Sequence, residues 1–168
     1  MKELKRYTII GIIFVLITGS FAHFVYGWSN QNHIAGLFTP INESIWEHMK
    51  LLFFPMLIYS FFMTYKFVQE YPCIISALSF GILAGTFLIP LFYYAYTGIL
   101  GKDIFILDIG TFILSILIAF WISYRLTLSC ILESYTFLLC LLVCLLLACF
   151  LVFTYHTPHF AIFQDPTV

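Results

Sequence analysis

The run Leu138-Leu139-Cys140-Leu141-Leu142-Val143-Cys144-Leu145-Leu146-Leu147 decides the fold class, because a helix built from it has no polar face. A helix that is apolar on every side is either buried in a large core or surrounded by lipid. We expect this helix to face lipid over much of its circumference.

The whole chain shares this apolar character. Of its 168 residues 62% are hydrophobic and 9% are charged, and its mean hydropathy is +1.04. A soluble domain is about 45–50% apolar, and a helix needs about 20 mainly apolar residues to cross a bilayer. Five segments meet this need, so we predict a single all-α integral membrane bundle over residues 1–168 with about five transmembrane helices. The predicted spans are residues 7–27, 45–66, 73–96, 105–124 and 134–155.

Basic residues predict how the bundle is oriented. Lys and Arg concentrate on the cytoplasmic side of membrane proteins. With the N-terminus inside and an odd number of spans, the C-terminus lies outside, and five basic residues lie inside against two outside. The inner set is Lys2, Lys5, Arg6, Lys66 and Arg125, and the outer set is Lys50 and Lys102. All five histidines then fall on the outer side, namely His23, His33, His48, His156 and His159.

The segment Asn42-Glu43-Ser44-Ile45-Trp46-Glu47-His48-Met49-Lys50 is the main candidate site, because it concentrates ionisable groups at the start of an apolar helix. If the helix begins near Pro40, Glu43, Glu47 and Lys50 share one face and His48 lies beside it. Two carboxylates and an imidazole form a mixed ligand set that suits zinc, iron or manganese.

A structural interpretation competes with this site. Ser44 and Glu47 have the spacing of a capping box, in which Ser44 is the N-cap and the Glu47 side chain returns to its backbone. Trp46 would then anchor the chain at the membrane interface, and Lys50 would extend toward water. Glu43 and His48 have no role in this interpretation, and charged groups at a membrane are costly to keep without one.

Other residues of the outer side extend the candidate site. Asp108 is either an N-cap or a carboxylate inside the membrane, where it would pair with His23, His48 or a cation. Pro90 is expected to bend the third span, and the tyrosines beyond it belong either to an interfacial belt or to a cavity. These tyrosines are Tyr93, Tyr94 and Tyr96.

Two further patterns carry structural expectations. Ala77, Gly81 and Gly85 recur every four residues, which lets a second helix approach closely, either within the chain or from a second copy in a homo-oligomer. The five cysteines include no Cys-x-x-Cys pair and lie in or beside predicted spans. We therefore expect small apolar fillers rather than disulfides or a metal centre.

The motif Asn42-Glu43-Ser44-x-Trp46-Glu47-His48-x-Lys50, with Pro55 and the terminal Thr157-Pro158 and Phe163-x-Asp165-Pro166, resembles a family of small uncharacterised bacterial multi-pass membrane proteins. The resemblance covers most of the chain and implies a bacterial cytoplasmic membrane location. The family pattern has Pro-Pro where this chain has Pro158-His159, so His159 is not expected to be a general feature. The family implies no activity.

Three functions fit these observations. The first is a metal-dependent hydrolase or transferase that acts on a lipid or amphiphilic substrate at the outer face. The second is a small proton- or cation-coupled transporter or solute-binding subunit, and the third is a non-catalytic structural or interaction protein. The expected partners are the lipid bilayer and a lipid or small-molecule ligand; no pattern indicates nucleic acid.

For the enzyme, the residues divide by role. The catalytic candidates are Glu43, Glu47, His48 and Asp108. The candidate ligands of a divalent transition metal such as zinc are Glu43, Glu47, His48 and His23. The cavity candidates are Tyr93, Tyr94, Tyr96, Lys50 and Trp46.

Overall fold

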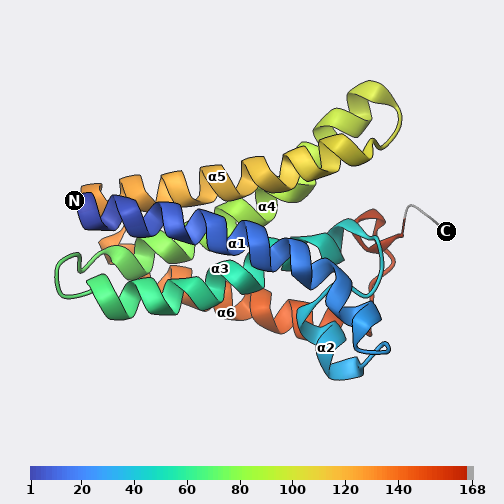
Figure 1. Ribbon diagram of the computed structural model, residues 1–168, viewed down its shortest axis with the longest axis horizontal. Helices are drawn as coiled ribbons and strands as arrows, with labels where there is room; N and C mark the ends of the chain where they lie inside the picture. Colours follow the sequence, from blue (N-terminus) through green and yellow to red (C-terminus); the bar gives the residue numbers. More distant parts are fainter. Residues whose placement is uncertain (166–168) are drawn as a thin grey trace.

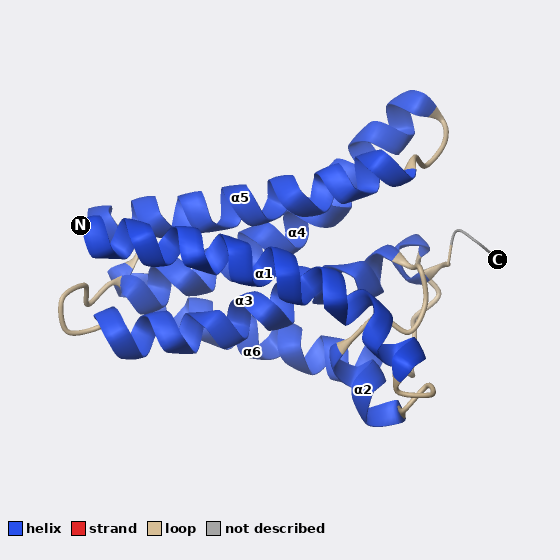
Figure 2. Cartoon of the chain, viewed as in Figure 1, coloured by secondary structure: helices blue, strands red, loops and turns tan. Residues whose placement is uncertain are grey.

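Six α-helices account for most of residues 1–165, the part of the chain that the computed structural model describes (Figures 1 and 2). Within this part there is no strand, and two short 3₁₀ helices complete the secondary structure. Pro166 of the C-terminal motif lies outside the described residues. The helices are α1 (Lys2–Trp28), α2 (His33–Phe38), α3 (Ile45–Phe67), α4 (Ile74–Leu100), α5 (Phe105–Ser129) and α6 (Thr136–Phe153), and the 3₁₀ helices are η1 (Glu133–Tyr135) and η2 (Ala161–Phe163).

The long helices confirm the predicted fold class. Each predicted span forms a helix, and four of these, α1, α4, α5 and α6, are long and apolar enough to cross a membrane. The fifth, α3, lies between α1 and α4 and has fifteen of its 23 residues buried. Its buried Glu47 and Lys50 make it more polar than its neighbours. The chain is a multi-pass membrane protein in which α3 is the central helix.

The stripe of small residues on α4 packs within the chain. Ala77 is fully buried, and a Cβ atom added to Gly85 would lie 2.6 Å from the Cβ of Ala119 on α5. A Cβ atom added to Gly81 would overlap the side chain of Ser123, which also lies on α5. The stripe therefore lets α4 and α5 approach closely, and a second copy of the chain has no access to it.

The two ends of the bundle differ in shape. The N-terminus lies at one end, with the loops that join α3 to α4 and α5 to α6, and the described C-terminal segment lies at the other (Figure 1). At this second end the tips of α4 and α5 project away from α3 and α6 (Figure 1). The histidine-bearing loop between α1 and α3 lies at this end too.

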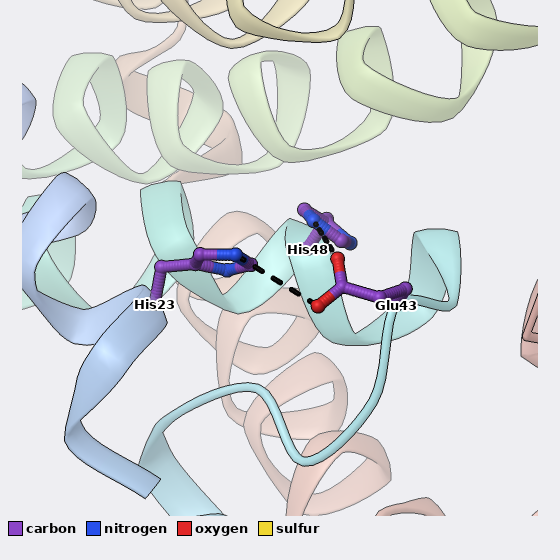
Figure 3. A group of neighbouring side chains, drawn as sticks. All are labelled: His23, Glu43 and His48. Carbon is purple, nitrogen blue, oxygen red and sulfur yellow. Dashed lines mark ion pairs between the residues drawn. The ribbon is translucent and has the colours of Figure 1, made fainter. Parts of the chain in front are cut away.

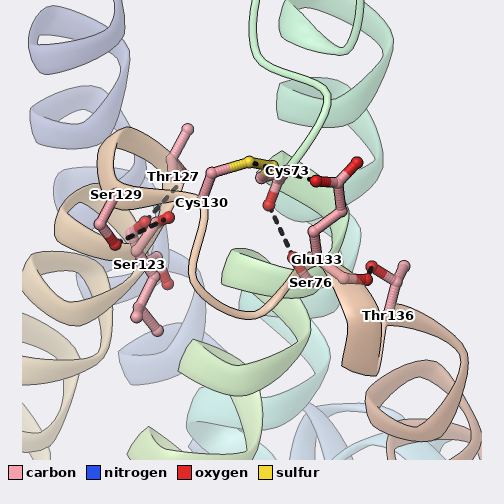
Figure 4. The surroundings of a disulfide bond; sticks show 9 residues. Cys73, Ser76, Ser123, Thr127, Ser129, Cys130, Glu133 and Thr136 are labelled. Atoms are coloured by element: carbon pink, nitrogen blue, oxygen red, sulfur yellow. Dashed lines mark hydrogen bonds between the residues drawn. A yellow bond between two sulfur atoms is a disulfide. The ribbon is translucent and has the colours of Figure 1, made fainter.

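The expectation that all cysteines are apolar fillers is wrong for Cys73 and Cys130. These two residues form a disulfide that ties the start of α4 to the end of α5, with their Cα atoms 5.3 Å apart (Figure 4). Cys130 adopts a left-handed conformation that ends α5 and turns the chain back. Spacing did not reveal the pair because 57 residues separate its members. The other three, Cys140, Cys144 and Cys149, are free, as expected.

Candidate functional site

The site begins at the N-terminus of α3. Ser44 is the N-cap, and its hydroxyl accepts a hydrogen bond from the Glu47 backbone N–H at 3.4 Å. This confirms the N-cap expected in the capping box, but the Glu47 side chain does not complete the box, since it turns elsewhere. The alternative of a helix that begins near Pro40 is wrong. Glu43 therefore lies in the loop before the helix, and its carboxylate is free to turn sideways.

Glu43 lies between two histidines from different helices (Figure 3). Its Oε1 is 3.8 Å from Nε2 of His23 on α1, and its Oε2 is 3.4 Å from Nε2 of His48 on α3. One ligand atom from each residue lies within 4.8 Å of the others. This spacing fits one metal ion with three protein ligands, and three ligands leave a fourth tetrahedral position open for water or substrate.

The backbone of α3 orients the His48 ring. Nδ1 of His48 lies 3.0 Å from the carbonyl oxygen of Ser44, which can only accept, so Nδ1 carries the proton and donates it. Nε2 then points its lone pair at Glu43. A lone pair and a carboxylate that face each other require a positive charge between them, either a proton or a metal ion. When Nε2 also carries a proton, the hydrogen bond that it donates to Glu43 lowers the pKa of this carboxyl group, which is ionised at neutral pH.

The C-terminal segment supports the same loop. Oδ2 of Asp165 accepts a hydrogen bond from the Glu43 backbone N–H at 3.2 Å. Two residues earlier, the ring of Phe163 packs on Trp46 with centroids 4.8 Å apart. Sequence reasoning did not select Asp165 as a site residue, although the motif Phe163-x-Asp165 contained the signal. Trp46 is buried against this segment and does not line the cavity.

Glu47 and Lys50 form a separate, buried ion pair. Nζ of Lys50 lies 2.7 Å from Oε2 of Glu47 and also donates to Thr154 Oγ1 at 2.6 Å and to the Gly36 carbonyl at 3.0 Å. The same Glu47 oxygen accepts from the Ile41 N–H at 3.0 Å. These bonds join α2, α3 and α6. Glu47 and Lys50 are therefore not part of the group formed by His23, Glu43 and His48.

A cavity of about 490 Å³ adjoins His23, Glu43 and His48, between α1, α3, α4 and α5. Asp108 and Tyr93 line it, so two further predicted residues meet the three metal-ligand candidates there. Tyr96 does not line it, but its hydroxyl donates a hydrogen bond to Asp108. Asp108 lies in the first turn of α5 and is not its N-cap, which is Ile104. Sequence reasoning did not select Asp103, the fifth acidic or imidazole residue of the cavity lining, which lies on the loop before α5.

Several predicted residues lie outside this arrangement. Tyr94 is exposed beside the Tyr93 ring, as an interfacial belt would place it. His156 and His159 are exposed on the C-terminal segment and do not line the cavity. His33 begins α2, where its carbonyl accepts from the Tyr155 hydroxyl.

Comparisons with known proteins place the chain in a family and assign no activity. The model of a family described as "Family of unknown function (DUF6512)" matches residues 1–168. No curated protein and no solved structure matches the chain. The expectation of an uncharacterised family that covers most of the chain is thus confirmed, whereas the bacterial cytoplasmic membrane stays a prediction.

Proposed function

We propose that the chain, which belongs to this DUF6512 family of unknown function, is a metal-dependent membrane hydrolase. His23, Glu43 and His48 bind one divalent transition metal ion, for which zinc is the best candidate. The observation that carries the proposal is the carboxylate between two imidazole Nε2 atoms at the wall of a cavity. Two nitrogens and one oxygen with an open fourth position are typical of catalytic zinc.

The surrounding residues supply what such a reaction needs. A zinc ion bound there would lower the pKa of a water molecule to about 7. Asp108 faces the same cavity, where it can take a proton from that water and deliver it to the leaving group. The Tyr96 hydroxyl holds the Asp108 carboxylate in place. Water is then added across an ester or amide bond: its oxygen joins the acyl carbon, the bond to the leaving oxygen or nitrogen breaks, and that atom gains the proton.

The packing beneath the cavity favours an enzyme over the predicted transporter. Directly below the cavity, α3 and α5 contribute buried apolar side chains to the core, with no ionisable group among them. These are Leu52, Phe53, Met56, Ile116 and Phe120. A transported ion would meet no charged side chain in this layer, only the buried hydroxyls of Thr86 and Ser115, so its passage would be costly. We therefore assign the site to chemistry at one face.

Metal content tests the proposal. Protein purified without chelator should contain about one zinc per chain by elemental analysis, and calorimetric titration of the stripped protein should restore it. His23→Ala, Glu43→Gln and His48→Ala should each weaken zinc binding more than about 100-fold, because loss of even an outer-shell partner costs about 10–100-fold.

His156→Ala is the matched control, since it removes an exposed histidine from the same end of the molecule. It should bind zinc as the native chain does. Stripped native protein that takes up no zinc, or variants that bind zinc unchanged, would refute the metal site. Zinc-loaded protein that cleaves no ester or amide, while the stripped protein behaves identically, would refute the hydrolase.

A further inference from the structure

Residues of α1 and α5 line the cavity, and these two helices diverge toward its end of the bundle (Figure 1). At Gly19 these helices touch, since an added Cβ atom would lie 2.7 Å from the Phe112 ring. Closer to the cavity end they separate, and Phe24 of α1 and Phe105 and Ile109 of α5 line the gap. These side chains are 53%, 77% and 42% exposed. Both helices are long apolar spans, so the exposed sides of these residues continue the surface that contacts lipid.

The depth of the metal-ligand candidates matches the position of a lipid's acyl linkage. The 27 residues of α1 extend about 40 Å at about 1.5 Å per residue, which covers the hydrocarbon core of about 30 Å and part of both headgroup layers. His23 lies five residues before the end of α1 at Trp28, or about 7 Å along the axis. This depth is the boundary where acyl chains join their headgroups.

The charge of the cavity selects among lipids. Its lining contains three carboxylates, Glu43, Asp103 and Asp108, and neither Lys nor Arg is among the lining residues. Lys102 is exposed on the nearby loop and does not line the cavity. A bound divalent cation would offset two of the three negative charges. In a cavity of low dielectric, an anionic headgroup would meet net repulsion with no counter-charge to bind it.

We propose that the substrate of this site is an acyl lipid with no net negative charge, which enters from the bilayer between α1 and α5. The inference rests on the hydrolase proposed above. The acyl chain lies against Phe24, Phe105 and Ile109, and the ester or amide linkage reaches His23, Glu43 and His48. Hydrolysis converts the uncharged linkage into a fatty acid anion, which the cavity carboxylates then repel, so the same charge that selects the substrate promotes product release.

Lipids with identical acyl chains test the class. In detergent micelles, zinc-loaded protein should cleave diacylglycerol at least about tenfold faster than phosphatidic acid, by fatty acid release. The uncleavable diether analogues should bind with the same preference in a fluorescence titration. Equal or better binding of the anionic diether would refute the lipid class whatever the hydrolysis result. Selective diether binding without hydrolysis would support the lipid class while refuting the hydrolase.

Two substitutions test the charge and the entry route. Asp103→Asn should raise the rate on phosphatidic acid relative to diacylglycerol by several-fold, and an unchanged ratio would refute the role of charge. Ile109→Trp should fill the gap and reduce diacylglycerol cleavage at least about tenfold, while zinc content is retained. Ile106→Trp is its control, since Ile106 is 75% exposed on the same helix and does not line the cavity. Equal effects of the two tryptophans would refute lateral entry.

Discussion

Glu43 lies one residue before the N-cap of α3, and this position turns its carboxylate toward His23 and His48. Its backbone N–H donates to Asp165, so the C-terminal segment fixes the loop that carries it. A residue that orients a ligand without binding the metal acts like an outer-shell partner.

Asp165→Ala removes the acceptor of this hydrogen bond and should therefore weaken zinc binding about 10-fold, within the range for outer-shell partners, without abolishing it. Calorimetric titration of the stripped variant measures the effect. Gln164→Ala, at the exposed neighbouring residue, should leave the affinity unchanged. A zinc affinity equal to that of the native chain in Asp165→Ala would show that the contact does not hold Glu43 in place.

Glu47 and Lys50 contribute to stability. Lys50→Met removes the charge that faces Glu47 in a fully buried environment, and breaking a buried pair in this way costs about 3–5 kcal/mol. The double variant Glu47→Gln/Lys50→Met should recover part of that loss, because it leaves no unpaired charge. Thermal unfolding in detergent measures the stability of the single variant and of the double variant.

Zinc binding by the same variants separates stability from ligation. The folded fraction of Glu47→Gln should bind zinc with native affinity, since its carboxylate pairs with Lys50 and lies apart from His23 and His48. A loss of zinc as large as that in Glu43→Gln would instead make Glu47 a ligand.

At the residue level the sequence named the three residues that lie together, His23, Glu43 and His48, but added Glu47 to them. Glu43 and His48 could be selected because no helix-capping role accounts for them. Glu47 was grouped with Glu43 because helical spacing alone would place them on one face, and the loop conformation of Glu43 breaks that relation. The Asp165 contact spans 122 residues, so the motif Phe163-x-Asp165 could mark the residue but not identify its partner.

Among the elements, α4 and α5 depend most on close packing. A side chain at Gly85 would press on Ala119, and neither Cβ atom can move without shifting its helix. Overpacking of this kind costs about 1–3 kcal/mol.

Gly85→Ala should accordingly lower the thermal unfolding midpoint, measured in detergent. Gly98→Ala lies on the same helix, where an added Cβ meets open space. It should leave stability unchanged or raise it by up to about 1 kcal/mol, because alanine favours the helix. Equal destabilisation by both would show that the close approach of α4 and α5 contributes little.

The elements themselves were largely predictable, because a span must be apolar over a fixed length. Some predicted spans are shorter than the helices: α1 begins at Lys2 rather than residue 7, and α5 ends at Ser129 rather than residue 124. Apolarity measures the part of a helix in lipid, whereas the hydrogen-bonded helix continues into the headgroup layer. The six-residue α2 is too short for any hydrophobic period, so it had no sequence signal.

At the scale of the whole molecule, burial strengthens the predicted orientation. Lys50 was one of two basic residues assigned to the outer side, but it is fully buried in an ion pair and exposes no charge. The exposed count becomes five basic residues at the N-terminal end against one, Lys102, at the other. Exposed Lys and Arg mark the cytoplasmic side, so we expect the candidate site to face outward.

This orientation places the disulfide end of the bundle in the cytoplasm, where thiols are kept reduced. We therefore expect Cys73 and Cys130 to be free thiols in growing cells and to form the disulfide on oxidation. Acid quenching followed by alkylation should trap both as thiols, and treatment with diamide before quenching should protect both from alkylation.

Labelling of single introduced cysteines tests the orientation directly. In a Cys73→Ser/Cys130→Ser background, Lys102→Cys should react with a membrane-impermeant maleimide in intact cells, because it is exposed at the site end. Glu70→Cys is exposed at the opposite end and should react only after the membrane is permeabilised. The reverse labelling pattern would show that the protein has the opposite orientation in the membrane. The disulfide would then face an oxidising compartment, and the cavity between α1 and α5 would receive lipids from the inner leaflet.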